Sequence, residues 1–178
     1  FMSKNYLILV LSLFVTSQMF AQTLPDVISY DDLKWEMVEG KNYVLDVNGV
    51  ELWDTLSKED FIKKFGVPTK IHNEDGALDW PGEPKHRMYY YDDSYFETYD
   101  GEFNSFYIKS PEYKVLTKYF KAGIGVGDHI SALKDFKDGV LCLRKTNEYL
   151  LQSISEGFFT LRTDDQGHIV SIDYNFPM

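Results

Sequence analysis

Two aromatic-rich hairpins limit what this sequence can fold into. The first, Tyr95–Ile108, consists of two strand-like runs joined at Asp100-Gly101. That dipeptide favours the positive φ angles of a two-residue hairpin turn. The second, Phe158–Tyr174, has its expected two-residue turn at Gln166-Gly167. We therefore expect the rest of the chain to be organised around these two hairpins.

Alternation along the hairpin strands predicts an inner and an outer face. In the second hairpin the inner face holds mostly apolar side chains: Phe159, Leu161, Thr163, Val170, Ile172 and Tyr174. The same register places Phe96, Phe103 and Tyr107 on the outer face of the first hairpin. Tyr and Phe are enriched at interfaces, so an aromatic outer face indicates a binding surface. The alternative is that the N-terminal segment or another strand covers these rings, which would make them part of the core.

One helix is clearly marked before the first hairpin. Ser57 is a favourable N-cap, and Asp60 adds negative charge at the helix N-terminus. Gly66 suits the position after the last turn, and Pro68 cannot continue a helix. The pattern predicts a helix over residues 58–65.

The second half of the chain repeats the order of the first. A strand-like run and a second helix, which opens at Val126-Gly127-Asp128, precede the second hairpin. The spacing from Gly101 to Gly167 nearly equals that from Ile62 to Ile130, which indicates an internal duplication. We predict an α+β fold in which two tandem helix-plus-antiparallel-strand repeats share one sheet, with the helices packed on one face.

The chain begins with features of a secretory signal peptide. Lys4 precedes an apolar run, and Ala21 is a small residue at a plausible cleavage point, so residues 1–21 are expected to be removed. Polar residues interrupt the run too early for a transmembrane helix. We predict a secreted or periplasmic protein with no membrane span. The other segments are an N-terminal arm, a first repeat and a second repeat: residues 22–40, 41–110 and 111–178.

Composition restricts the partners and the redox chemistry. The formal net charge is −10, and no run of Lys or Arg offsets it, so nucleic acid is not an expected partner. The only cysteine, Cys142, lies in the apolar run Val140–Leu143, where we expect a buried small hydrophobe. Without an intrachain disulfide, the domain must be held together by its core.

Several short features resemble the β-lactamase-inhibitor-like superfamily. They are the helix and Phe-Gly-Val-Pro segment at Ser57–Pro68, the Val126-Gly127-Asp128 opening and the two hairpins, within residues 43–174. The resemblance implies two tandem repeats on one sheet, as in exported inhibitors and small outer-membrane assembly lipoproteins. The chain lacks the inhibitors' disulfides and a lipidated N-terminal cysteine. No functional residue is carried over from the family.

No catalytic or metal-binding motif stands out in the sequence. Gly123-x-Gly125-x-Gly127 is followed by Asp128 where a dinucleotide fingerprint needs glycine, and the Gly-Lys-Ser/Thr of a P-loop is missing. The four histidines have no His-x₃-His or Glu-x-x-His spacing. We predict a protein that is not an enzyme and needs no cofactor or metal.

The remaining candidate is Trp80, in a long loop rich in Gly and Pro. An exposed Trp could anchor a partner protein or stack on a sugar; alternatively, it folds down to anchor its own loop. The predicted binding site is Trp80, Phe96, Phe103 and Tyr107. We expect an exported module that binds another envelope or extracellular protein. A carbohydrate-binding accessory protein of the cell envelope is the alternative, and a hydrolase is a more distant one.

Overall fold

A computed structural model describes residues 26–41, 44–74, 86–117, 120–137, 139–152 and 158–175. The predicted signal peptide and Trp80 lie outside the described residues.

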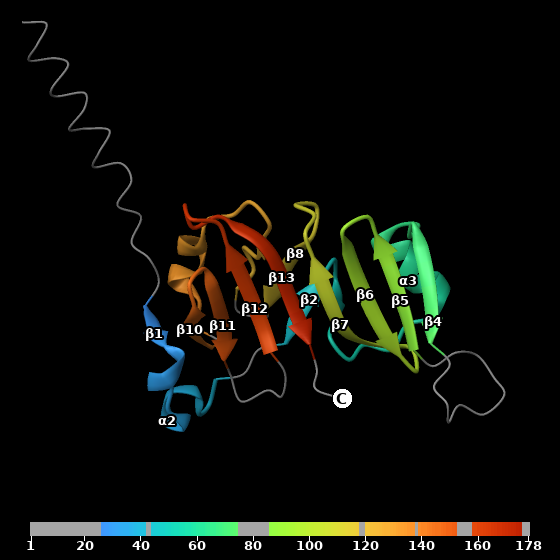
Figure 1. The fold of residues 1–178 in the computed structure, drawn as a ribbon. Coiled ribbons are helices and arrows are strands. Elements are labelled where there is room, and N and C mark those ends of the chain that lie inside the picture. The colour runs from blue at the N-terminus through green and yellow to red at the C-terminus, as the bar shows by residue number, and fades with distance from the viewer. Residues whose placement is uncertain are drawn as a thin grey trace, which may run out of the picture.

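A nine-stranded sheet forms the body of the molecule (Figure 1). Two four-stranded meanders, β4 to β7 and β10 to β13, meet where β7 pairs with β13. All neighbours in this sheet are antiparallel except β1, which runs parallel to β10. From one edge to the other the strands are β1 (Val27–Ser29), β10 (Val140–Lys145), β11 (Glu148–Gln152), β12 (Phe158–Thr163), β13 (Ile169–Asn175), β7 (Glu102–Ile108), β6 (Ser94–Tyr99), β5 (His86–Tyr91) and β4 (Lys70–Glu74).

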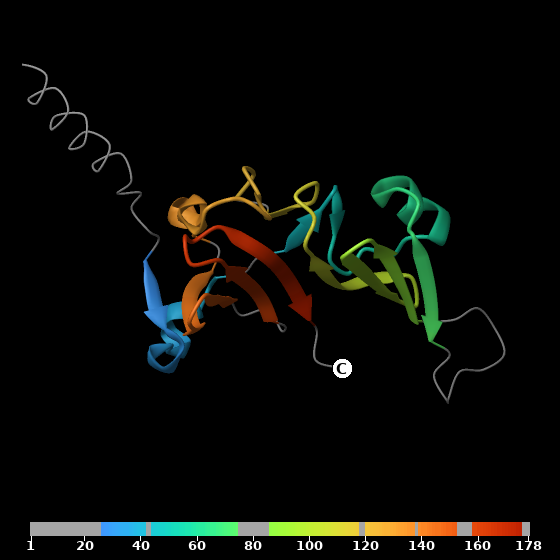
Figure 2. The ribbon, with the colours of Figure 1, turned by 45° about the horizontal axis from the view of Figure 1, so that its top comes forward.

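A smaller, four-stranded sheet and two helical segments cover one side of the large sheet. In order, the small sheet consists of β3 (Val50–Glu51), β2 (Leu45–Val47), β8 (Lys114–Thr117) and β9 (Ile124–Gly125). Figure 2 shows it between α3 (Lys58–Phe65) and the 3-10 helix η2 (Ile130–Asp135), on the same side of the large sheet. The N-terminal arm adds η1 (Tyr30–Asp32) and α2 (Trp35–Val38).

The predicted α+β fold of two helix-plus-strand repeats is wrong, because strands dominate the chain and build two sheets. The second predicted helix is only the short 3-10 helix η2. Its buried apolar side chains, Ile130 and Leu133, are three residues apart, which matches a three-residue turn. Strand β2 pairs with β8 from the other half of the chain, so the small sheet belongs to neither predicted repeat.

Helix α3 has the predicted bounds, Lys58–Phe65. The Ser57 hydroxyl oxygen accepts a hydrogen bond from the Asp60 N–H at 3.1 Å, and Gly66 ends the helix at φ 89°. The buried face of α3 carries Phe61, whose ring stacks on Tyr89 with 4.3 Å between centroids. Aromatic packing between α3 and the large sheet thus fixes the core in this half of the molecule.

The first hairpin has the predicted turn but an unpredicted bulge. Asp100 and Gly101 have φ angles of 55° and 86°, as a two-residue turn requires. Glu97 pairs with Ser105 while Thr98 pairs with Phe103, which leaves Asn104 as an extra residue. Because of this bulge, Phe103 and Phe106 are both fully buried, whereas strict alternation would put them on opposite faces.

The second hairpin differs from its predicted turn. Asp164 and His168 close a three-residue loop, with the Asp164 N–H donating to the His168 carbonyl at 2.8 Å. A second register shift leaves Val170 without a partner in β12, so this side chain is 45% exposed while Ile169 enters the core. The predicted two-residue turn at Gln166-Gly167 and the inward position of Val170 are therefore wrong.

Candidate functional site

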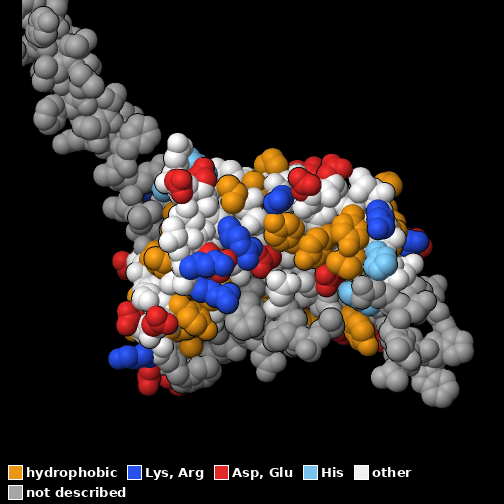
Figure 3. All heavy atoms as spheres, viewed as in Figure 1, with side chains coloured by type: hydrophobic (Ala, Val, Ile, Leu, Met, Phe, Trp, Pro, Cys, Tyr) orange, Lys and Arg blue, Asp and Glu red, His pale blue; other side chains and the backbone are white. Residues whose placement is uncertain are grey.

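The candidate site lies on the side of the large sheet opposite α3, η2 and the small sheet, which we call the open face. Figure 3 looks onto it: hydrophobic side chains gather over β5, β6 and β7, and basic side chains over β10 to β12. Residues in register on neighbouring strands project to the same side and contact one another. One row crosses the sheet in register: Ile28, Cys142, Leu150, Thr160, Asp173, Tyr107, Tyr95, Tyr90 and Lys70.

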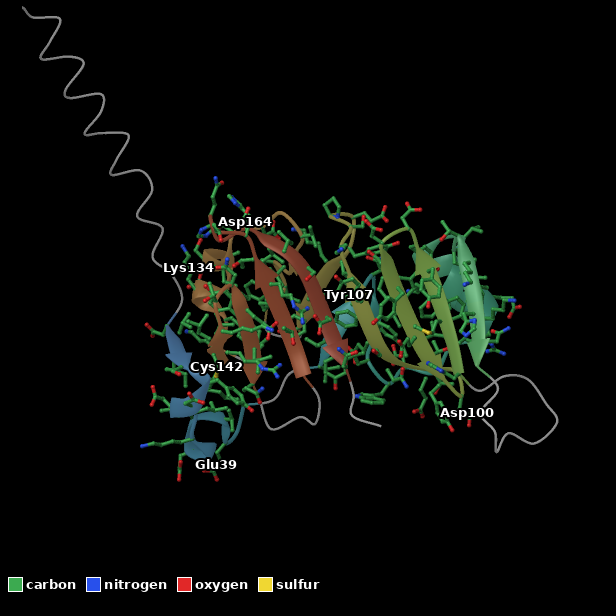
Figure 4. All side chains as sticks on the ribbon, in the orientation of Figure 1. Glu39, Asp100, Tyr107, Lys134, Cys142 and Asp164 are labelled. Carbon is green, nitrogen blue, oxygen red and sulfur yellow. The ribbon has the colours of Figure 1, made fainter. Side chains whose placement is uncertain are left out.

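The aromatic part of this row, Tyr90, Tyr95 and Tyr107, is called the tyrosine row below. All three rings are half-buried. The centroids of Tyr95 and Tyr107 are 5.5 Å apart with an interplanar angle of 27°, and those of Tyr90 and Tyr95 are 6.0 Å apart. Figure 4 shows Tyr107 near the middle of the open face. Because Tyr95 and Tyr107 stack, while Tyr90 is tilted by 49° to Tyr95, the row presents mainly ring edges and hydroxyl groups outward.

A lysine caps each end of the tyrosine row. Lys70 Nζ lies 5.6 Å from the centroid of Tyr90, and Lys109 Nζ lies 5.9 Å from that of Tyr107. Both distances suit a cation–π contact. Burial raises the pKa of Tyr95, so its hydroxyl remains a hydrogen-bond donor well above neutral pH.

Beside the tyrosine row lies a charged cluster built from four strands, β10 to β13. Arg162 Nε donates to Glu148 Oε2 at 3.1 Å, and Arg162 Nη1 donates to Asp173 Oδ1. Lys145 Nζ lies 3.2 Å from the same Glu148 oxygen. Glu148 and Asp173 are only 3% and 5% exposed, so their charges depend on these partners.

The ionisation of the cluster follows from its burial. Burial raises the pKa of Asp173, and the hydrogen bond and charge of Arg162 offset only part of that rise. Burial lowers the pKa of Arg162, but Asp173 and Glu148 more than compensate and raise it overall. Arg162 therefore stays a cation that holds two buried carboxylates together.

Of the predicted site residues that the structure describes, only Tyr107 lies on the open face. Phe96 and Phe103 have no exposed surface, so their placement on an outer face is wrong. The rings of Phe65 and Phe96 have centroids 4.5 Å apart, so α3 covers them from the core side. They belong to the core, as the alternative interpretation held, and both α3 and Tyr113 pack on Phe96. Trp80 lies outside the described residues.

Sequence reasoning missed Tyr90 and Tyr95, although a signal for Tyr90 was present. Strand β5 contains three consecutive tyrosines, Tyr89, Tyr90 and Tyr91. Neighbouring residues in a strand point to opposite faces, so burial of Tyr89 and Tyr91 places Tyr90 on the other side. Tyr95 follows because it pairs directly with Tyr90.

No family model, curated protein or solved structure matches this chain. The resemblance to the β-lactamase-inhibitor-like superfamily therefore stays a prediction. Function has to be argued from the chemistry and geometry of the open face.

The described part of the chain also bears on metal sites, membrane spans and thiol chemistry. Within it, no group of three or more His, Cys, Asp or Glu side chains could hold a metal ion. No helix among the same residues is long and apolar enough to cross a membrane. Cys142 is fully buried, as expected, and burial raises its pKa to about 11, which suppresses thiolate chemistry at neutral pH.

Proposed function

We propose that this chain is an exported module that binds another envelope or extracellular protein through the tyrosine row. The observation that carries the proposal is the row itself: three tyrosines in register on three neighbouring strands of the open face. Tyrosine is among the residues that contribute most to binding energy at protein interfaces. A rigid strand platform also keeps the entropy cost of binding low, because the rings are already held in place.

The orientation of the rings favours a protein partner over a sugar. A sugar stacks on the flat face of an aromatic ring, whereas here Tyr95 and Tyr107 turn these faces toward each other. Lys109 occupies the region above the Tyr107 ring, and Lys70 that above Tyr90. The row offers ring edges and hydroxyl groups, which suit apolar side chains and hydrogen-bond acceptors of a protein surface.

Charge also contributes to the proposed recognition. The chain carries a net charge of −10, but Lys70 and Lys109 place two cations at the ends of the row. The complementary partner surface is an apolar centre with acidic groups on either side. Charges at the rim of an interface mainly raise the rate of association and its salt dependence.

Site-specific photo-crosslinking tests the proposal. A benzoylphenylalanine at position 107 should form a covalent adduct with an envelope or extracellular protein of the producing cell. The same probe at Val67, which is 84% exposed and follows α3, should give no such adduct. The adduct partner, once purified, should bind the Tyr95→Ala/Tyr107→Ala variant about 30-fold more weakly than wild type, as the loss of an interface hot spot implies.

The control for this measurement is Tyr99→Ala. Tyr99 lies on β6 and is 44% exposed, but it is outside the row and should affect affinity little. Equal weakening by Tyr99→Ala, or adducts of equal yield from positions 67 and 107, would contradict the proposal. If the wild type binds a glycan on an array and the double variant does not, the partner is a carbohydrate and not a protein.

A further inference from the structure

A cavity of about 410 Å³ lies at the β1 edge of the large sheet. One wall comes from the N-terminal arm, with Ile28 of β1 and Met37 of α2. The other wall comes from the body of the protein, with Leu133, Phe136 and Val140. Cavities of roughly 300–1,000 Å³ that combine apolar side chains with a few polar groups are typical binding sites for small molecules.

The charged residues that line the cavity favour an anion. Lys41 and Lys134 contribute two cations, against the single carboxylate of Asp26. The Lys41 ammonium donates a hydrogen bond to the carbonyl of Lys137 at 3.2 Å, which holds it beside the segment that carries Phe136. Figure 4 shows Lys134 on η2, near the arm. An anion bound at the cavity would therefore contact more positive than negative charge.

We propose that this cavity binds a small amphiphile, an unbranched alkyl chain that ends in a carboxylate. The alkyl chain would lie against Met37, Phe136 and Val140, and the carboxylate would contact Lys41 and Lys134. Each methylene that packs against these apolar side chains strengthens binding by up to about fourfold, so affinity must rise with chain length until the cavity is full.

The ligand also links the arm to the body. Arm and body contribute opposite walls, so a bound chain contacts both and stabilises the docked arm. Amide hydrogen exchange in residues 26–38 should slow when the cavity is occupied. That measurement is independent of the affinity itself.

Titration calorimetry of the full chain with hexanoate, octanoate and decanoate tests the proposal. The dissociation constant should fall with each added methylene, by up to about fourfold. Nonyltrimethylammonium carries the same alkyl chain as decanoate and the opposite charge, and should bind about tenfold more weakly, because each surface charge contact contributes up to about fivefold. No binding of any carboxylate, affinity independent of chain length, or equal binding of the ammonium compound would each overturn the proposal.

Matched variants locate the binding to this cavity. Met37→Trp should fill it and abolish octanoate binding, while Met37→Leu should keep it. Lys134→Gln should weaken binding about two- to fivefold, as expected for a surface charge contact. Lys137→Gln is the control, because Lys137 is exposed and only its backbone carbonyl contacts Lys41. Retention of full affinity in Met37→Trp, or equal effects of Lys134→Gln and Lys137→Gln, would place the ligand elsewhere and overturn the proposal.

Discussion

Arg162 joins two carboxylates that the open face buries almost completely. It contacts Glu148 through Nε and Asp173 through Nη1, from the strand that lies between theirs. The Arg162 side chain is 40% exposed, whereas the side chains of Glu148 and Asp173 are buried, so solvent can replace Arg162 only in part. Removal of the arginine takes the cation away from buried Asp173 and leaves Glu148 with only the more exposed Lys145 and Arg144, which costs more than the contact itself contributes.

Arg162→Leu should therefore destabilise the protein by about 2 kcal/mol at neutral pH, measured by urea unfolding. Arg144→Leu is the matched control. Arg144 is 55% exposed and lies 3.6 Å from Glu148, and an exposed pair contributes less than about 1 kcal/mol. If both variants lose the same stability, Arg162 is not what compensates the buried carboxylates.

The destabilisation by Arg162→Leu should depend on pH with a defined sign. Burial already raises the pKa of Asp173, and loss of Arg162 removes the groups that lower it. A carboxyl group whose pKa is higher in the folded than in the unfolded state stabilises the folded state at low pH. That stabilisation is lost as the pH rises from the unfolded pKa, about 4, through the folded pKa. The stability difference between variant and wild type should therefore shrink on acidification toward pH 4.

At the scale of secondary structure, the sequence predicted a helix and a turn correctly but assigned several side chains to the wrong face of the sheet. Ser57 and Gly66 define α3, and Asp100-Gly101 defines a turn, because these residues act on the backbone nearest to them. The faces of the hairpins depend on the bulges at Asn104 and Val170, which no local pattern marks. One extra residue inverts every later side chain, which is how Phe96 and Phe103 were placed on the wrong side.

The loop of the second hairpin also fixes the start of η2. Gly167 has a φ of 84°, and a Cβ added there would lie 2.7 Å from His129 Nε2. The His129 ring cannot easily move, because its Nδ1 accepts the Ser131 N–H that begins η2. Hairpin and 3-10 helix therefore pack without room for a methyl group.

Gly167→Ala should cost about 2 kcal/mol or more in unfolding free energy, since it combines a left-handed backbone with this clash. Gly127→Ala separates the two effects: its φ is 90°, but nothing lies within 4 Å of the added Cβ. That variant should lose only about 1 kcal/mol. Equal losses at the two glycines would show that η2 does not pack tightly on the hairpin.

At the scale of the whole molecule, the sequence could not show which strands of its two halves pair with each other. The two meanders join through β7 and β13, where Ile108 pairs with Ile172 and Phe106 with Tyr174. β2 and β8 form a second link between the halves in the small sheet. These pairs are distant in sequence, so alternation within each strand carries no information on which strand lies beside it.

Because the two halves share one core where β7 pairs with β13, the protein should unfold as a single cooperative unit. Ile108 is fully buried on β7, and Ile108→Ala should cost about 3 kcal/mol through lost burial and the cavity left behind. Hydrogen exchange by mass spectrometry should show the same loss of protection in peptides from β4–β7 and from β10–β13. Val170→Ala, at an exposed position, should change neither set. Loss of protection in β4–β7 alone would mean that each meander, with its own helical segment, folds as a separate unit.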